Sequence, residues 1–277
     1  MNLSKKDDAA AKGPTAAIVT ADDGGVGKTT FAIQLVTAHG LGERPVDLFQ
    51  MDSKAKLAAK SGEPVTSLVV SSKQRGEDLI ASDVIAPWYR AVTTMGETGR
   101  SALLEVGGAM SPLFHAGIVD LDLAEDIQEL NLNVVVFVVC KAGEDSTRQL
   151  LRELARLGHN LPNARAIVVL NEVNGNPVEA ARYLADDLRK PFASALKKYP
   201  AIRMPKVRMR SMAIYERMHA LPSEIVSWHA DSYREAIRRT GLPRDQAKLF
   251  VKDIAEWSAV TLEQIEQIMP WLERNTP

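Results

Sequence analysis

The sequence contains a single cysteine, Cys140, among its 277 residues. One thiol excludes an intrachain disulfide and argues against an iron–sulfur cluster or a multi-thiol metal site within one chain. An excess of charge of one sign is also lacking, because 34 Lys and Arg residues face 35 Asp and Glu residues. With a formal net charge of −1, any attraction to nucleic acid must come from a local patch.

Long hydrophobic runs are absent as well. The longest wholly apolar run, Val134–Cys140, is far too short to span a bilayer, so we expect no membrane partner. Residues 1–13 are polar and rich in Ala and Lys, without the apolar centre of a secretory signal. We therefore expect a flexible tail on a cytoplasmic protein.

A glycine-rich turn organises the rest of the chain. The apolar run 16–20 before it is typical of a buried strand, and residues 31–36 after it are typical of a helix. Gly24, Gly25 and Gly27 allow successive backbone N–H groups to point into one concavity, and the helix N-terminus adds partial positive charge. Lys28 would reach terminal phosphates, and the Thr29 hydroxyl would coordinate Mg²⁺.

Apolar runs and helical segments alternate from residue 14 to residue 171. Among them we expect a first helix that ends at Gly40, a short strand at 66–70 and a helix at 115–130. This alternation predicts a parallel sheet with helices on both faces. The fold class expected is therefore α/β, a three-layer P-loop NTPase with a mostly parallel sheet and a C-terminal helical extension. We assign residues 14–210 to the nucleotide-binding domain and residues 211–277 to the extension packed on it.

Three polar side chains, Asp52, Glu105 and Asn171, lie at the ends of apolar runs. Ligands of α/β proteins bind outside the carboxyl ends of parallel strands. From position alone, Asp52 either faces a ligand or caps a helix, and Glu105 either holds a Mg²⁺-bound water or pairs with a base. Asn171 is equally consistent with an ordinary turn.

The stretch 24–30 resembles the deviant Walker A motif of the ParA/MinD family of P-loop ATPases, and the strand-end residues match that family in place and type over about residues 14–171. The resemblance implies ATP and Mg²⁺ as ligands, with Lys28 and Asp52 as catalytic residues. Thr29 and Glu105 would organise the metal, and Asn171 would recognise the base. The expected nucleotide contacts are Gly24, Gly25, Val26, Gly27, Lys28, Thr29, Thr30 and Asn171.

Four positions depart from the family pattern. Asp22 replaces a glycine of the general phosphate-loop motif, and Asp23 replaces the signature lysine that reaches the phosphates of a partner subunit. Gln50 and Glu105 each stand where the family has Asp. An ATPase activity would accordingly be weak or degenerate. Either a nucleotide-sandwich homodimer uses another cation, or that dimer does not form, or hydrolysis is lost.

The last third of the chain contains a basic stretch opposed internally only by Asp186 and Asp187. It is either a solvated helix face or a patch that contacts DNA phosphates without reading sequence. Its members are Arg182, Arg189, Lys190, Lys197, Lys198, Arg203, Lys206, Arg208 and Arg210. An edge strand is expected at 202–207 and helices at 211–220, at 223–239, and from the break at 241–243 to about 258. The pattern Thr261-x-x-Gln264 predicts the capped start of a final helix.

Three functions fit these features. The first is a ParA-like ATPase switch in plasmid or DNA partition, stability or conjugative transfer, acting with a partner protein or non-specific DNA. The second is a nucleotide-binding scaffold that does not hydrolyse, which Asp22 and Asp23 favour. The third is an ATP-dependent ligase or kinase of the dethiobiotin-synthetase type, which needs a second pocket that the sequence does not identify.

Overall fold

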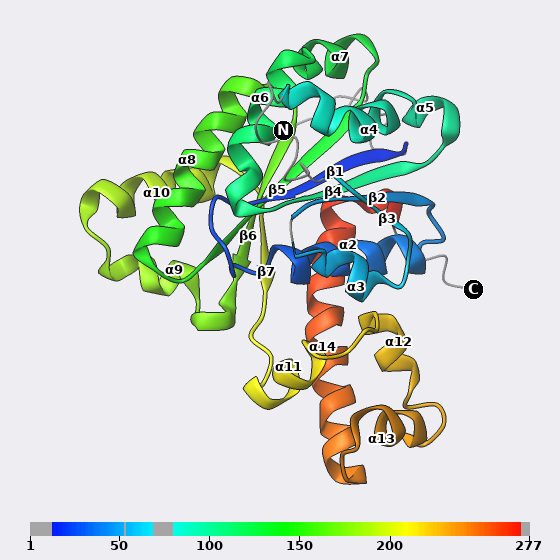
Figure 1. Cartoon of the computed structure of the whole chain (residues 1–277). Helices are drawn as coiled ribbons and strands as arrows, with labels where there is room; N and C mark the ends of the chain where they lie inside the picture. The colour runs from blue at the N-terminus through cyan, green and yellow to red at the C-terminus, as the bar shows by residue number, and fades with distance from the viewer. Residues whose placement is uncertain (1–12, 53, 69–79, 273–277) are drawn as a thin grey trace.

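A seven-stranded sheet forms the centre of the protein in a computed structural model that describes residues 13–52, 54–68 and 80–272 (Figure 1). Its strand order is β3-β2-β4-β1-β5-β6-β7, and every pairing is parallel. The strands are β1 (Thr15–Thr20), β2 (Val46–Met51), β3 (Val65–Ser67), β4 (Ser101–Val106), β5 (Asn133–Lys141), β6 (Arg165–Asn171) and β7 (Ala201–Met204). The expected α/β sheet is confirmed, with β1 central and β7 at an edge.

Helices cover both faces of this sheet. The α-helices are α2 (Lys28–Leu41), α3 (Lys56–Ser61), α4 (Ala81–Thr93), α5 (Met95–Thr98), α6 (Ser111–Asp120), α7 (Leu123–Glu129), α8 (Glu144–Asn160), α9 (Pro177–Ala180), α10 (Asp186–Lys198), α11 (Met209–Tyr215), α12 (Pro222–Ser227), α13 (Arg234–Thr240) and α14 (Arg244–Ile268). Short 3₁₀ turns are η2 (Gly108–Met110), η3 (Glu172–Asn174), η4 (Ala181–Tyr183) and η5 (Pro270–Leu272). Within the described ranges, no helix combines the length and apolar character needed to cross a membrane.

Two hydrophobic cores lie on opposite faces of the sheet. Along β1, Ala17 and Val19 belong to the core under α2 and α14, whereas Ala16 and Ile18 belong to the core under α4, α6 and α8. This alternation follows from the two-residue period of a strand, and all of β1 is buried because both faces are covered. The two cores hold the carboxyl ends of the strands, and the loops after them, along one edge.

Two helix boundaries expected from the sequence are wrong in this body. Gly40 does not end the first helix, which continues to Leu41 and is closed by Gly42. The expected helix 115–130 is two helices, α6 and α7, because Asp122 adopts a left-handed backbone with φ of 49° that an α-helix cannot accommodate. The expected strand 66–70 begins at Val65, and its residues 69 and 70 lie outside the described ranges.

The C-terminal helical segment, defined as α11–α14 (residues 209–268), extends away from the sheet along α14 (Figure 1). The expected helix 223–239 is wrong, because Ser232 and Tyr233 have positive φ and separate α12 from α13. The expected helix start at Thr261 is also wrong. Thr261 lies inside the 25-residue α14, and its hydroxyl donates to the carbonyl oxygen of Trp257 one turn earlier.

Candidate functional site

The glycine-rich turn connects the end of β1 to the first residue of α2 at the centre of the sheet. Gly25 and Gly27 have φ of 71° and 100°, which favour glycine. A Cβ atom on Gly27 would lie 2.3 Å from Nδ2 of Asn171, whereas Gly24 and Gly25 face open space. No side chain caps α2, so its first N–H groups remain available to an anion.

Lys28 lies at the head of α2 and is only 7% exposed. Its ammonium donates to the carbonyl oxygens of Asp23 at 2.5 Å and Ala21 at 3.4 Å, so the side chain folds back along its own loop. Burial lowers the pKa of Lys28, against the opposing effect of the Glu105, Asp52 and Asp23 carboxylates. With Glu153, four acids therefore lie near one buried cation.

The Thr29 hydroxyl donates to the carboxylate Oε1 of Glu105, the penultimate residue of the apolar strand β4 beside β1. Burial raises the pKa of Glu105 to about 7, although the Thr29 hydrogen bond acts in the opposite direction. A hydroxyl and a carboxylate oxygen are ligands that suit Mg²⁺, which usually keeps several waters and phosphate oxygens. The described residues contain no cluster of three His, Cys, Asp or Glu that could hold a metal alone. The pair therefore fits a cation that is completed by a nucleotide.

Asp52 follows β2 and lies next to the glycine turn after β4. A Cβ atom on Gly107 would lie 3.4 Å from the Cβ and Cγ atoms of Asp52. The Asp52 carboxylate accepts from the Lys54 backbone N–H at 3.0 Å, and α3 begins only after Ala55, so Asp52 does not cap that helix. Asp52 and Glu105 thus lie near the same lysine from neighbouring strands.

Asn171 ends β6 and reaches across to the glycine-rich turn. Its Nδ2 donates to the Val26 carbonyl oxygen at 2.7 Å, and its Oδ1 accepts from the Val173 N–H at 3.1 Å. The side chain therefore braces the turn and also caps η3. Recognition of a base by Asn171 stays a prediction.

Gln50, one of the departures from the family pattern, is fully buried. Its Nε2 donates to the Ser67 hydroxyl at 2.8 Å, and its Oε1 accepts from the Ala58 N–H at 3.3 Å. Gln50 therefore joins β2 to β3 and α3, a structural role that the sequence alone did not indicate.

The two acids of the turn are paired with bases on β5 and α8. Asp22 Oδ1 lies 2.8 Å from Nη1 of Arg156, and its Oδ2 lies 3.9 Å from Arg152 Nη2. Asp23 Oδ2 lies 4.0 Å from Lys141 Nζ. These three bases could not be identified from the sequence, because their proximity depends on how α8 and β5 pack.

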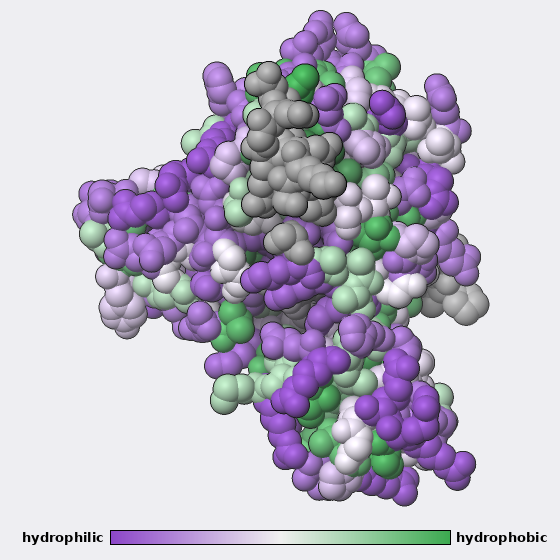
Figure 2. Space-filling model, in the orientation of Figure 1, coloured by the Kyte–Doolittle hydropathy of each residue, from purple (hydrophilic) through white to green (hydrophobic). Residues whose placement is uncertain are grey.

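The basic stretch is partly neutralised within the chain. Asp186 pairs with Arg189 and Lys190, and Arg203 pairs with Glu172. Arg208 contacts Asp253, and Arg210 donates to Gln246. Within the described ranges, the exposed bases Arg182, Lys197, Lys198 and Lys206 have no ion-pair partner. Figure 2 shows hydrophilic residues predominating over the region of α9 and α10.

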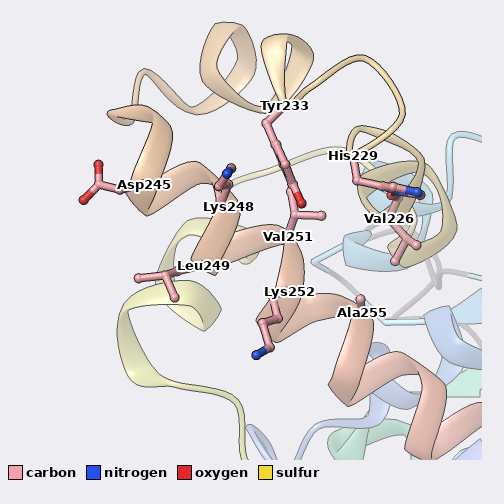
Figure 3. A pocket seen from close by; sticks show the side chains of 9 residues that line it. All are labelled: Val226, His229, Tyr233, Asp245, Lys248, Leu249, Val251, Lys252 and Ala255. Atoms are coloured by element: carbon pink, nitrogen blue, oxygen red, sulfur yellow. Dashed lines mark hydrogen bonds between the residues drawn. The ribbon is translucent and has the colours of Figure 1, made fainter.

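A concavity of about 730 Å³ lies within the C-terminal helical segment (Figure 3). It is lined by Val226, His229, Tyr233, Asp245, Lys248, Leu249, Val251, Lys252 and Ala255. The lining is mainly apolar, and Lys248 Nζ lies 5.5 Å from the centre of the Tyr233 ring. Because no residue of the glycine-rich turn lines this pocket, it gives no support to a phosphorylated small substrate.

The chain is similar to two solved structures of proteins from Aquifex aeolicus. The MinD cell division protein of Aquifex aeolicus is 16% identical and has a TM-score of 0.46, over 88% of this chain and 95% of that one. The MinC:MinD cell division protein complex of Aquifex aeolicus contains a chain that is 14% identical with a TM-score of 0.44, over 88% of this chain and 94% of that one.

No curated protein matches the sequence. A family model, described as the CobQ/CobB/MinD/ParA nucleotide binding domain, matches residues 17–203. The match covers more than half of the chain and contains the glycine-rich turn, Lys28, Glu105 and Asn171. The chain therefore belongs to the CobQ/CobB/MinD/ParA nucleotide-binding domain family.

Proposed function

We propose that the protein is a ParA/MinD-type switch that binds Mg²⁺-ATP and serves plasmid or DNA partition, stability or conjugative transfer. The observation that carries this proposal is the Thr29–Glu105 contact beside the buried Lys28, at the head of an uncapped helix. These groups provide a cation, a hard-oxygen pair and free backbone N–H groups at one place.

Each residue of this site has a separate task in the proposal. Lys28 and the N–H groups of residues 24–30 hold the phosphates, and Thr29 with Glu105 holds the cation. Mg²⁺, when bound, neutralises charge on the phosphate oxygens. Asp52 orients a water for hydrolysis, and the adjacent Gly107 and Gly108 allow that segment to respond to the terminal phosphate.

A nucleotide-dependent switch acts through a molecule that binds one of its states, and we propose that this molecule is a protein partner. The similar MinD chain occurs in a complex with MinC, and this complex suggests the kind of partner without identifying it for this protein. Non-specific DNA is a second partner for this chain, through the exposed bases Arg182, Lys197, Lys198 and Lys206. The internal pairing of Arg189, Lys190, Arg203 and Arg208 reduces the charge available for it.

Binding without hydrolysis is the second candidate function. It is favoured by the Asp23 carboxylate, which lies on the turn and is 32% exposed at its side chain. An acid at this position repels phosphate from an approaching second nucleotide and cannot supply the cation that a sandwich homodimer needs.

Calorimetric titration with Mg²⁺-ATP, run with phosphate release, separates these functions. We expect wild type to bind and Lys28→Ala to lose binding, because the buried cation next to the turn is gone. Lys252→Ala, which removes an exposed lysine of α14 that pairs with Glu256, is the matched control and should bind as wild type. Turnover that is lost in Asp52→Ala supports the switch, binding without turnover supports the scaffold, and no binding by wild type refutes both.

A further inference from the structure

Asp22 lies in a loop, but its side chain is largely buried and contacts two arginines. Its side chain is only 11% exposed, and one carboxylate oxygen lies 2.8 Å from Arg156 Nη1 while the other faces Arg152. Both arginines are on α8, one turn apart, and their side chains are 39% and 55% exposed. The acidic beginning of the turn is thus tied to a helix on the other side of β1.

Arg156 also faces a second carboxylate, Glu153, at 3.7 Å. Glu153 is fully buried, accepts from the Thr20 hydroxyl at 2.8 Å and the Ser111 hydroxyl at 3.1 Å, and lies 3.2 Å from His115 Nε2. Burial alone would raise the pKa of Glu153, but His115 and these hydroxyls lower it below its usual range. Arg156 therefore bridges two carboxylates.

These contacts join the elements that surround the nucleotide site. Thr20 is the last residue of β1, and Ser111 and His115 belong to α6, which the short turn η2 connects to Gly107. A Cβ atom on Gly108 would lie 2.8 Å from the carbonyl oxygen of Asp22, so that turn packs against the same residue. The side chain and the backbone of Asp22 thus contact α8 and the turn before α6.

We propose that Arg156, assisted by Arg152, is a positioning residue of the nucleotide site: it holds Asp22 away from the phosphates and fixes the phosphate loop to α6 and α8 through Glu153. The inference rests on the proposed function, because it assigns the residue that makes an acidic loop able to accept an anion. Without the arginine, a largely buried carboxylate would stand uncompensated at the edge of the loop and repel bound phosphate.

Nucleotide affinity tests the electrostatic part of this role. We expect Arg156→Gln, which removes the charge and keeps most of the volume, to raise the Kd for Mg²⁺-ATP about tenfold or more. Arg148→Gln is the matched control: it lies on the same helix, its partner is the exposed Glu144, and it should leave Kd unchanged. The double variant Asp22→Asn/Arg156→Gln should recover affinity to within about threefold of wild type, because the Asp22 charge is removed with its partner while Glu153 keeps its contacts to Thr20, Ser111 and His115.

A merely structural role for Arg156 predicts that the double variant binds no better than Arg156→Gln, and that result would overturn the proposal. Wild-type affinity in Arg156→Gln, with binding lost in Lys28→Ala, would also overturn it and leave the proposed function intact. If Arg156→Gln does not fold, Arg152→Gln gives the same test with a smaller rise in Kd, because its pair is longer at 3.9 Å.

Backbone hydrogen exchange of the nucleotide-free protein tests the tether independently of any ligand. We expect amides of residues 21–27 to exchange faster in Arg156→Gln than in wild type or Arg148→Gln, since the loop loses its connection to α8. Unchanged exchange would show that Asp22 does not fix the loop, whether or not the protein binds nucleotide. Faster exchange in a protein that binds no nucleotide would refute the proposed function and keep the tether.

Discussion

The α/β body and the C-terminal helical segment reach burial by different routes. In the body, long parallel strands bury both faces, and polar groups are concentrated at the strand ends, where Glu153 and Asp22 find several partners. In the C-terminal segment, α11, α12 and α13 have six or seven residues each, and their apolar side chains belong to the same core as α2. Short helices are marginal alone, so this segment depends on the body for its fold.

The largest expected effect is a loss of stability on removing a buried side chain of α14. Phe250 on α14 is 1% exposed and shares one hydrophobic cluster with Phe31 and Ile33 of α2. We expect Phe250→Ala to lower the free energy of unfolding by about 3–5 kcal/mol in urea, within one transition for body and segment. Leu249→Ala, 47% exposed on the same helix, should change it by less than about 1 kcal/mol. Two separate transitions in wild type would show that the segment folds alone.

The next prediction compares alanine substitutions at two glycines of the phosphate loop. Gly27→Ala places a methyl group at φ of 100° and 2.3 Å from Asn171, so we expect a loss of about 2–4 kcal/mol in urea unfolding. Gly25→Ala has φ of 71° and open space, so only backbone strain of about 1 kcal/mol remains. Equal losses in the two variants would contradict the close approach of Asn171.

The third comparison varies the pH, because α2 carries a buried histidine, His39. Burial lowers the pKa of His39 to about 4 from its ordinary 6.5. The unfolded chain therefore binds the proton first, and stability present above pH 6.5 is lost as pH falls towards 4, by up to about 3 kcal/mol.

Urea unfolding at several pH values measures this dependence as the difference between wild type and His39→Leu. The raised pKa of Glu105 acts in the opposite direction but is present in both proteins, so it cancels. His159→Gln, an exposed histidine on α8, should leave the pH dependence as in wild type. A His39→Leu protein with the wild-type slope between pH 6.5 and 4 would refute the assignment.

The smallest expected effect concerns a single hydrogen bond between the two regions. The Ser258 hydroxyl of α14 donates to Gln34 Oε1 of α2 at 2.9 Å, and both residues are buried. Ser258→Ala leaves that oxygen unpaired, so we expect a loss of about 1–2 kcal/mol. Ser227→Ala removes an exposed hydroxyl bonded within its own helix and should cost at most about 0.5 kcal/mol. Thermal unfolding of the two variants in parallel distinguishes these values.

The same contrast explains what the sequence could predict. The strands of the body were predictable because β-branched runs bounded by glycine-rich or polar turns leave few alternatives, and the phosphate loop carries its geometry in three glycines. The break at Ser232 and Tyr233 was not predictable, since a left-handed backbone at two ordinary residues arises from tertiary packing. Thr261 matched a capping pattern, but the same hydroxyl can bond one turn back within a continuous helix.

The site residues that could be predicted are those whose place follows from the order of strands and helices. Four of the predicted residues lie within two positions of the start of α2 or of the end of a strand, so the sheet brings them together: Lys28, Thr29, Glu105 and Asn171. Arg152 and Arg156 act through the rotation of α8 about its axis, which no local pattern encodes. Glu153 could have been noticed in the sequence, because it lies on the face of α8 that carries Leu150, Leu154 and Leu157. A charged side chain among buried leucines requires polar partners.

The unbroken α14 gives the protein a lever arm. Its 25 residues make a rod about 37 Å long, with one end against α2 and β7 and the other beyond the body (Figure 1). A tilt of about 5° at the end near α2 displaces the far end by about 3 Å, by the geometry of a rigid helix of that length. A distance measured to a label at Arg244 would therefore change more than a distance measured at the nucleotide site when α2 moves.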